Sequence, residues 1–131
     1  MRIFHSRVGD PMLLDSRENL TQVHDSFQAF LSSDEVEMEL SAKQDGSPAP
    51  YEAFLPGLRV RKGAGPIVLS QLPNGWLVLE GSQENLARYS SYFYFKPEQE
   101  SGHHHPEHCN VPGYLSPGSM NLIIEADPTW E

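Results

Sequence analysis

The chain has 131 residues, of which 38% are hydrophobic and 10% aromatic, so it can bury a core of its own and is not expected to be disordered. Its formal net charge of −9 makes nucleic acids and anionic membranes poor partners, because phosphate binding requires clustered Lys and Arg side chains. No apolar run approaches the ~20 residues of a membrane span. The first residues show no signal-peptide pattern, and a single cysteine excludes an internal disulfide, so we expect one cytoplasmic domain over residues 1–131.

In the first half of the chain, an apolar run at residues 12–14 leads into a predicted helix over residues 16–31. Ser16 suits the N-cap, and Asp15 with Glu18 has the spacing of a capping box. Residues 36–42 then alternate between apolar and polar side chains, as do residues 58–61 with basic side chains outward, so both segments are predicted strands. The apolar side chains at helical spacing are Leu20, Val23, Phe27, Phe30 and Leu31.

In the second half, Asn74-Gly75 separates two predicted strands, residues 67–72 and 76–80, and predicts a hairpin with a type I′ turn. A two-residue turn there would pair Leu72 with Leu77 and Ser70 with Leu79. A second helix is predicted over residues 82–95 and is stopped by Pro97, and residues 120–126 form the last predicted strand.

Two segments of the chain resemble each other. Residues 15–20 (DSRENL) are echoed by residues 81–86 (GSQENL), and Phe27 then falls in register with Phe93. Each half, 1–63 and 64–131, is predicted to run strand, strand, helix, strand, strand, which indicates two ββαββ repeats. We therefore predict an α+β fold, with a mainly antiparallel sheet and two helices on one face.

The conspicuous cluster of chemically active side chains lies at residues 103–109 (HHHPEHC). If residues 103–105 are extended, His103 and His105 point to the same side of the strand. Two imidazoles so placed could hold a transition-metal ion such as zinc, with His108, Cys109 or Glu107 completing a tetrahedron. The candidate metal ligands are therefore His103, His105, His108 and Cys109. The alternative is that these histidines belong to a solvated strand and stabilise it through hydrogen bonds.

The sequence does not predict an enzyme. His108 beside Cys109 is adjacency in sequence, which does not place a base against a nucleophile, and the acidic surroundings would raise rather than lower the pKa of a thiol. The chain has no G-x-S-x-G, P-loop or H-E-x-x-H motif. No cofactor is expected other than the transition metal considered above, and a small-molecule enzyme remains the third hypothesis for function.

Several other side chains allow two interpretations. Arg59, Arg61 and Lys62 form a basic stripe that is expected on the outward face of a strand, or as a site for an anion. Trp76 and Trp130 could be interface anchors or packing residues. After Lys96 the chain has acidic residues and no Lys or Arg, so a basic protein partner is favoured electrostatically. An exposed strand edge would also allow a homodimer.

The second half of the chain resembles small bacterial proteins grouped with the immunity proteins of polymorphic toxin systems. The resemblance covers about residues 50–126 and is carried by residues 77–87, the histidines at 103–105, residues 112–115, Ser119 and residues 122–125. It implies a non-enzymatic binding protein that neutralises a cognate toxin by direct contact. The net negative charge agrees with a basic toxin as the partner. Protein binding is thus the first functional hypothesis and metal binding the second.

Overall fold

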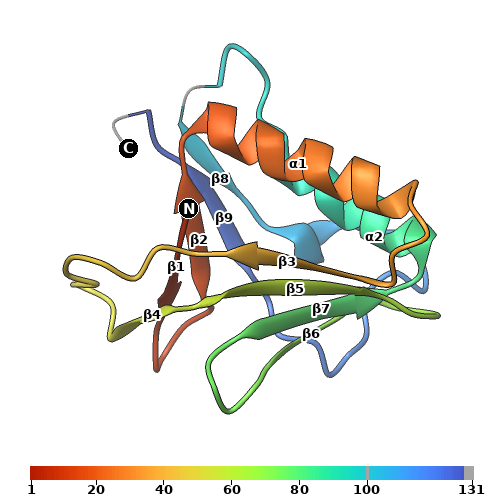
Figure 1. The fold of residues 1–131 in the computed structure, drawn as a ribbon, viewed down its shortest axis with the longest axis horizontal. Helices are drawn as coiled ribbons and strands as arrows, with labels where there is room; N and C mark the ends of the chain where they lie inside the picture. Colours follow the sequence, from red (N-terminus) through yellow and green to blue (C-terminus); the bar gives the residue numbers. More distant parts are fainter. Residues whose placement is uncertain (100, 129–131) are drawn as a thin grey trace.

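The computed structural model describes residues 1–99 and 101–128 of the chain (Figure 1). Trp130, one of the two tryptophans expected as an anchor, lies outside the described residues, as do Glu100 and Glu131. The first half contains β1 (Arg2–His5), β2 (Met12–Asp15), α1 (Arg17–Leu31), β3 (Glu37–Ser41), β4 (Ala53–Leu55) and β5 (Gly57–Lys62). The second contains β6 (Val68–Gln71), β7 (Leu77–Gly81), α2 (Gln83–Ser90), β8 (Gly102–His104) and β9 (Ile123–Ala126), with short 3-10 turns at Ser91–Phe93 (η1) and Pro106–His108 (η2).

The strands form two sheets. Sheet A has the order β4-β1-β2-β9-β8, and sheet B has the order β3-β5-β7-β6. The predicted α+β fold with mainly antiparallel pairing is confirmed, since five of the seven strand pairs found in residues 1–99 and 101–128 are antiparallel and two, β2–β9 and β5–β7, are parallel. The sequence suggested a single sheet. The chain instead forms two sheets and crosses between them repeatedly: α1 leads from β2 of sheet A to β3 of sheet B, β4 returns to sheet A, and Pro56 leads into β5 of sheet B. The two sheets and the two helices enclose one core.

Each sheet combines strands from both halves of the chain. In sheet A the hairpin β1–β2 of the first half lies beside the pair β8–β9 of the second, and in sheet B the hairpin β6–β7 lies beside the pair β3–β5. The parallel pairs β2–β9 and β5–β7 join the halves at the centre of each sheet. The second half has the expected order of two strands, helix and two strands, whereas the first half has one additional strand, β4.

The two helices begin as their sequences predict. Ser16 is the N-cap of α1 and Ser82 is the N-cap of α2, and each side-chain oxygen accepts a hydrogen bond from the backbone N–H three residues later at 3.2 Å. Helix α2 ends at Ser90 and continues as a 3-10 turn, so it is shorter than predicted. The helices lie side by side (Figure 1), and the rings of Phe27 and Phe93 are 5.3 Å apart.

The predicted register of the β6–β7 hairpin is wrong by one residue. Leu69 pairs with Leu79 and Ser70 with Val78, because the loop contains Pro73 as well as Asn74 and Gly75. The backbone N–H of Leu72 donates to the carbonyl of Trp76, and that of Gly75 donates to the carbonyl of Leu72. Within this loop, Gly75 alone has a positive φ, 95°, whereas a type I′ turn requires two such residues. The connection is therefore a three-residue loop that ends in a left-handed glycine. The shift places two leucines together in the core.

The main core lies between the two sheets and the helices, and its largest fully buried side chains include Phe27, Phe93, Phe95 and Tyr114. A smaller apolar cluster covers the opposite face of sheet A. There Phe4, Met12 and Leu14 are buried beneath partly exposed Tyr51 and Phe54. Within the described residues, the corresponding face of sheet B carries paired arginines and glutamates instead of such a cluster, so the two sheets present different outer surfaces.

Candidate functional site

The histidine run adopts the predicted alternation. His103 and His104 lie on β8, and His103 and His105 are on the same side, with ring centroids 5.2 Å apart. His104 points the other way, where its ring stacks on Phe95 at 4.0 Å and its Nδ1 lies 2.8 Å from the carbonyl oxygen of Tyr92. The middle histidine is therefore a packing residue, and the outer two remain available to bind.

The turn η2 brings three potential metal ligands together. His105 Nδ1 lies 3.4 Å from Glu107 Oε2, and His108 Nε2 lies 3.9 Å from the same oxygen. The rings of His105 and His108 stack with centroids 4.9 Å apart. One ligand atom from each of the three residues lies within 4.8 Å of the other two. We refer to His105, Glu107 and His108 as the His–Glu cluster.

Two of the four predicted ligands belong to this cluster, and two do not. His103 lies next to it, in ring contact with His105. Cys109 is half-buried and packs against the main core. Glu107, and not Cys109, is the third member of the cluster. The 3-10 turn brings residue 107 back towards residue 105, whereas residue 109 follows the turn and packs against the core.

Glu107 is the most buried member of the cluster, with 14% of its side chain exposed. Its second oxygen, Oε1, is buried and makes no hydrogen bond among the described residues, and the same is true of the hydroxyl of Tyr114. Burial raises the pKa of Tyr114, and the nearby Cys109, Tyr92 and Glu107 raise it further. The Glu107 carboxylate thus faces the two imidazoles with one oxygen and a tyrosine-rich interior with the other.

A second candidate site is a groove between α1 and β3. Two adjoining hollows of about 400 and 420 Å³ share Ser26, and α1 and β3 contribute most of their lining. Val23 and Phe30 of α1 and Met38 and Leu40 of β3 form its apolar part. Asp15, Glu35, Glu37 and Glu39 also line it, and no Lys or Arg does.

This groove runs along an unpaired strand edge. β3 pairs only with β5 among the described strands, and Figure 1 shows it as the strand of sheet B nearest to α1. The N–H of Lys62 donates a hydrogen bond to the carbonyl of Val36, and the N–H of Ala42 donates to the carbonyl of Pro56. In this antiparallel register the backbone groups of alternate residues, 36, 38, 40 and 42, therefore face β5 and its flanks. The N–H and C=O groups of Glu37, Glu39 and Ser41 therefore point to the open edge.

The other edge of sheet B is closed. Ile67 and Leu69 bond to the segment 114–120, through the backbone of Tyr114, Ser116 and Met120 and the side-chain oxygen of Ser119. A chain segment thus satisfies the edge of β6, whereas no described segment does so for β3. Open strand edges attract further strands, and proteins usually cover or charge them. β3 is charged rather than covered.

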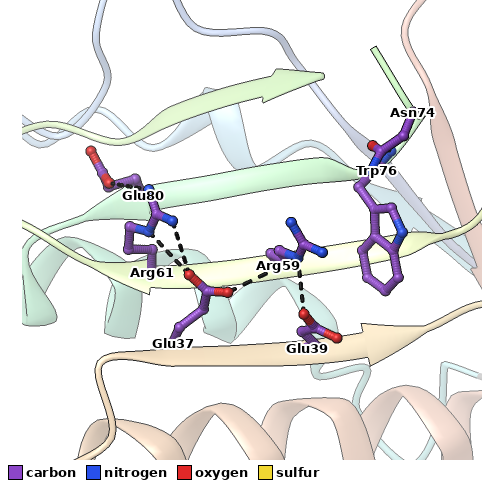
Figure 2. A network of polar contacts seen from close by, with 7 residues as sticks. All are labelled: Glu37, Glu39, Arg59, Arg61, Asn74, Trp76 and Glu80. Atoms are coloured by element: carbon purple, nitrogen blue, oxygen red, sulfur yellow. Dashed lines mark hydrogen bonds and ion pairs between the residues drawn. The ribbon is translucent and has the colours of Figure 1, made fainter. Parts of the chain in front are cut away.

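The outer face of sheet B carries a network of ion pairs (Figure 2). Arg59 and Arg61 of β5 lie between Glu37 and Glu39 of β3 on one side and Glu80 of β7 on the other, with nitrogen–oxygen distances of 3.0–4.0 Å. The expected outward orientation is observed for Arg59 and Arg61 but is wrong for Lys62, whose ammonium donates to the Ser33 carbonyl after α1 and lies over the Phe30 ring. β5 is an inner strand, so these arginines do not protect an edge. Exposed pairs of this kind are worth about 0–1 kcal/mol each.

Trp76 lies at one end of this network and is a packing residue as well as a surface residue. A Cβ atom on Gly57 would lie 2.5 Å from the indole ring, so the ring closes over that glycine. The guanidinium carbon of Arg59 lies 5.0 Å from the centre of the ring. The glycine is required here because any side chain would displace the indole.

Comparisons with protein-family models, with curated proteins and with solved structures find no match for this chain. Among residues 1–99 and 101–128, no helix has both the length and the apolar character needed to cross a membrane. The His–Glu cluster and the groove beside β3 are therefore the two candidate sites of this protein. Neither the buried Tyr114 beneath the cluster nor the groove has a local signal in the sequence, since both arise from contacts between distant segments.

Proposed function

We propose that this protein is a non-enzymatic binding protein that accepts a basic, extended segment of a partner protein along the open edge of β3. The observation that carries the proposal is the row of outward backbone groups of Glu37, Glu39 and Ser41 beside a groove that has both apolar and acidic lining. Addition of a strand to a sheet edge obtains affinity from main-chain hydrogen bonds and specificity from side-chain pockets. The groove supplies such pockets in Phe30 and Met38.

The charge of the edge supports a basic partner rather than a second copy of this chain. Asp34, Glu35, Glu37 and Glu39 lie along or just before β3. Arg59 and Arg61 pair with the two glutamates of β3, and the Lys62 ammonium lies 2.7 Å from the Ser33 carbonyl, so the edge keeps four carboxylates beside three cations. If two copies paired through β3, their glutamates would face one another, and like charges directly opposite are destabilising. A strand with Lys or Arg at alternate positions would instead meet these carboxylates with opposite charge, which also speeds association.

In its specific form, the proposal is that the protein is an immunity protein that neutralises a basic bacterial toxin by covering it. The net charge of −9 supports this form, because opposite net charges steer the two proteins together. No group of the immunity protein would need to react. The groove would hold a segment of the toxin, and the charged outer face of sheet B would lie next to the contact.

The binding mode can be tested with a peptide in which Lys and Val alternate. We expect a dissociation constant of about 1 mM or lower, which corresponds to a binding free energy of at least about 4 kcal/mol. Backbone amide signals of Glu37, Glu39 and Ser41 should shift in NMR spectra and become protected from hydrogen exchange. The decisive variant is Glu39→Pro, which removes one outward N–H at a position where an edge strand tolerates proline. It should weaken binding at least tenfold.

The matched control for that variant is Glu39→Ala, which loses the carboxylate and keeps the N–H. It should weaken binding less than Glu39→Pro does, and added salt should reduce the difference between Glu39→Ala and the unaltered protein. Absence of binding at 1 mM peptide, or equal binding by Glu39→Pro and Glu39→Ala, would show that β3 is not the binding edge.

The immunity role is tested by producing the protein together with the product of the neighbouring gene in bacteria. We expect that product alone to stop growth, and this protein to restore growth and to co-purify with it. Glu39→Pro should abolish the rescue while His105→Ala preserves it. A harmless neighbouring product would reject the immunity role, and rescue by Glu39→Pro would assign the contact to another surface.

A further inference from the structure

We propose that His105, Glu107 and His108 form a binding site for one divalent transition-metal ion, for which zinc is the best match. This inference is independent of the proposed protein-binding role, because no residue of the groove beside β3 takes part in it. Two imidazole nitrogens and one carboxylate oxygen form a frequent zinc ligand set, in which a fourth position is left to water.

The distances within the cluster suit such an ion. Zinc binds nitrogen and oxygen ligands at about 2.0–2.2 Å, so neighbouring ligand atoms of a tetrahedron lie about 3.4 Å apart. His105 Nδ1 and Glu107 Oε2 are already 3.4 Å apart, and His108 Nε2 is 3.9 Å from the same oxygen. His108 is the most exposed ligand, with 72% of its side chain exposed, so it can close the remaining gap by rotation.

The backbone holds the ligands in place before any ion binds. The N–H of His108 donates to the carbonyl of His105 at 2.9 Å, which closes the turn between the two imidazoles. On one side of the turn, His104 is fixed by stacking on Phe95. On the other side, Cys109 packs against the main core. A site on a turn held at both ends loses little conformational entropy on binding.

Glu107 gives the independent reason to expect a cation. Its side chain is 14% exposed, its Oε1 is buried without a hydrogen-bond partner, and its only ionic partners among the described residues are the two imidazoles. A half-buried carboxylate requires positive charge or hydrogen bonds to compensate for lost hydration. No Lys or Arg follows Lys96 in the sequence, so this segment supplies no such group itself. A metal ion between the imidazoles and Oε2 would supply it.

His103 lies beside the proposed site rather than in it. Its ring contacts His105, and its strand position faces Glu125 across the β8–β9 pair. Exposed histidines bind metals weakly without any built site, so His103 offers a way to separate the two cases. A built site should depend on the half-buried Glu107, whereas adventitious binding by exposed imidazoles should not.

The test uses protein without an affinity tag, never exposed to nickel, stripped with a chelator and titrated with zinc chloride in a calorimeter. We expect one zinc ion per chain. Glu107→Gln keeps the shape of the side chain and should weaken zinc binding at least tenfold, as should His105→Ala. His24→Ala, which removes a histidine far along the sequence on α1, should leave the affinity unchanged, and Cys109→Ser should change it little.

Two further measurements keep the result interpretable if a variant is poorly folded. Zinc should raise the melting temperature of the unaltered protein and of His24→Ala, and raise that of Glu107→Gln clearly less at the same zinc concentration. Cobalt(II) in place of zinc should give the absorption of a four-coordinate nitrogen and oxygen site. Less than one equivalent of zinc, or equal affinity for Glu107→Gln and the unaltered protein, would overturn the proposal and leave adventitious binding by the exposed histidines.

Discussion

The strand that follows α1 is β3, and the strand that follows α2 is β8. Both are edge strands, one in sheet B and the other in sheet A, and each is joined to an inner strand from its own half. β3 carries Glu37 and Glu39 and lies along an apolar groove, whereas β8 is short and leads into the His–Glu cluster. The edge strands at equivalent positions in the two halves thus carry different functional groups, an acidic strand edge in one half and a histidine-rich turn in the other. The repeated order of strands and helix therefore supports two separate candidate sites.

The starts of the two helices show how far the equivalence extends. Ser16 and Ser82 make the same cap, and Leu20 and Leu86 are both fully buried. The asparagine within each cap differs in its partners. The side chain of Asn19 donates to the Asp15 carboxylate, four residues away, so its contact stays within the start of α1. The side chain of Asn85 donates to the carbonyls of Gly65 and Gly113 and ties two distant loops to α2.

The largest loss of stability is expected for substitutions at the contact between the two halves of the chain, and it tests whether the halves share one core. Phe27 and Phe93 are both fully buried, and their rings are in contact, so replacing either with alanine should cost about 3–5 kcal/mol of unfolding free energy. Because the two residues touch, the double variant should cost less than the sum. Urea denaturation of the four proteins measures this, with exposed Asp25→Ala as the control within about 0.5 kcal/mol. Additive losses would contradict a shared core.

A smaller loss of stability is expected at the two helix caps, and it should be larger for Asn85 in α2 than for Asn19 in α1. Asn85→Ala removes the side-chain donor to the Gly65 and Gly113 carbonyls and the acceptor for one Arg88 nitrogen, and should cost about 1–3 kcal/mol. Asn19→Ala removes one hydrogen bond near solvent and should cost about 0.5–1.5 kcal/mol. Both can be measured by thermal or urea unfolding. If Asn19→Ala proved the more damaging, the long-range role of Asn85 would be wrong.

The smallest effect concerns the loop between β3 and β4, which has no counterpart in the second half. The Arg2 guanidinium donates to Asp45 at 2.8 Å and holds the pKa of that carboxyl below its ordinary value of 3.8. A lowered pKa in the folded state means that the pair contributes its full stability above the unfolded pKa and loses it as pH falls through the folded pKa. Arg2→Gln should return the Asp45 pKa towards 3.8 in an NMR titration, and an unchanged pKa would rule out the pair in solution.

Short-range features of this protein could be predicted from the sequence. The caps at Ser16 and Ser82, the alternation of residues 37–41 and the opposite directions of His103 and His104 follow from the chain itself, because they depend on bonds and spacing within a few residues. The hairpin register was predicted incorrectly although it is also local, since Pro73 enlarged the loop by one residue.

Only the tertiary structure decided how strands were shared between the two sheets, which edge stayed open and which residues surround the histidines. The covering of β6 by residues 114–120, and the absence of such a cover on β3 within the described chain, depend on segments far apart in sequence. Glu107 was only one of several candidate ligands until the turn placed it against His105 and His108. The physical reason is that burial and convergence are properties of packed surfaces, and spacing along a chain does not specify which surfaces meet.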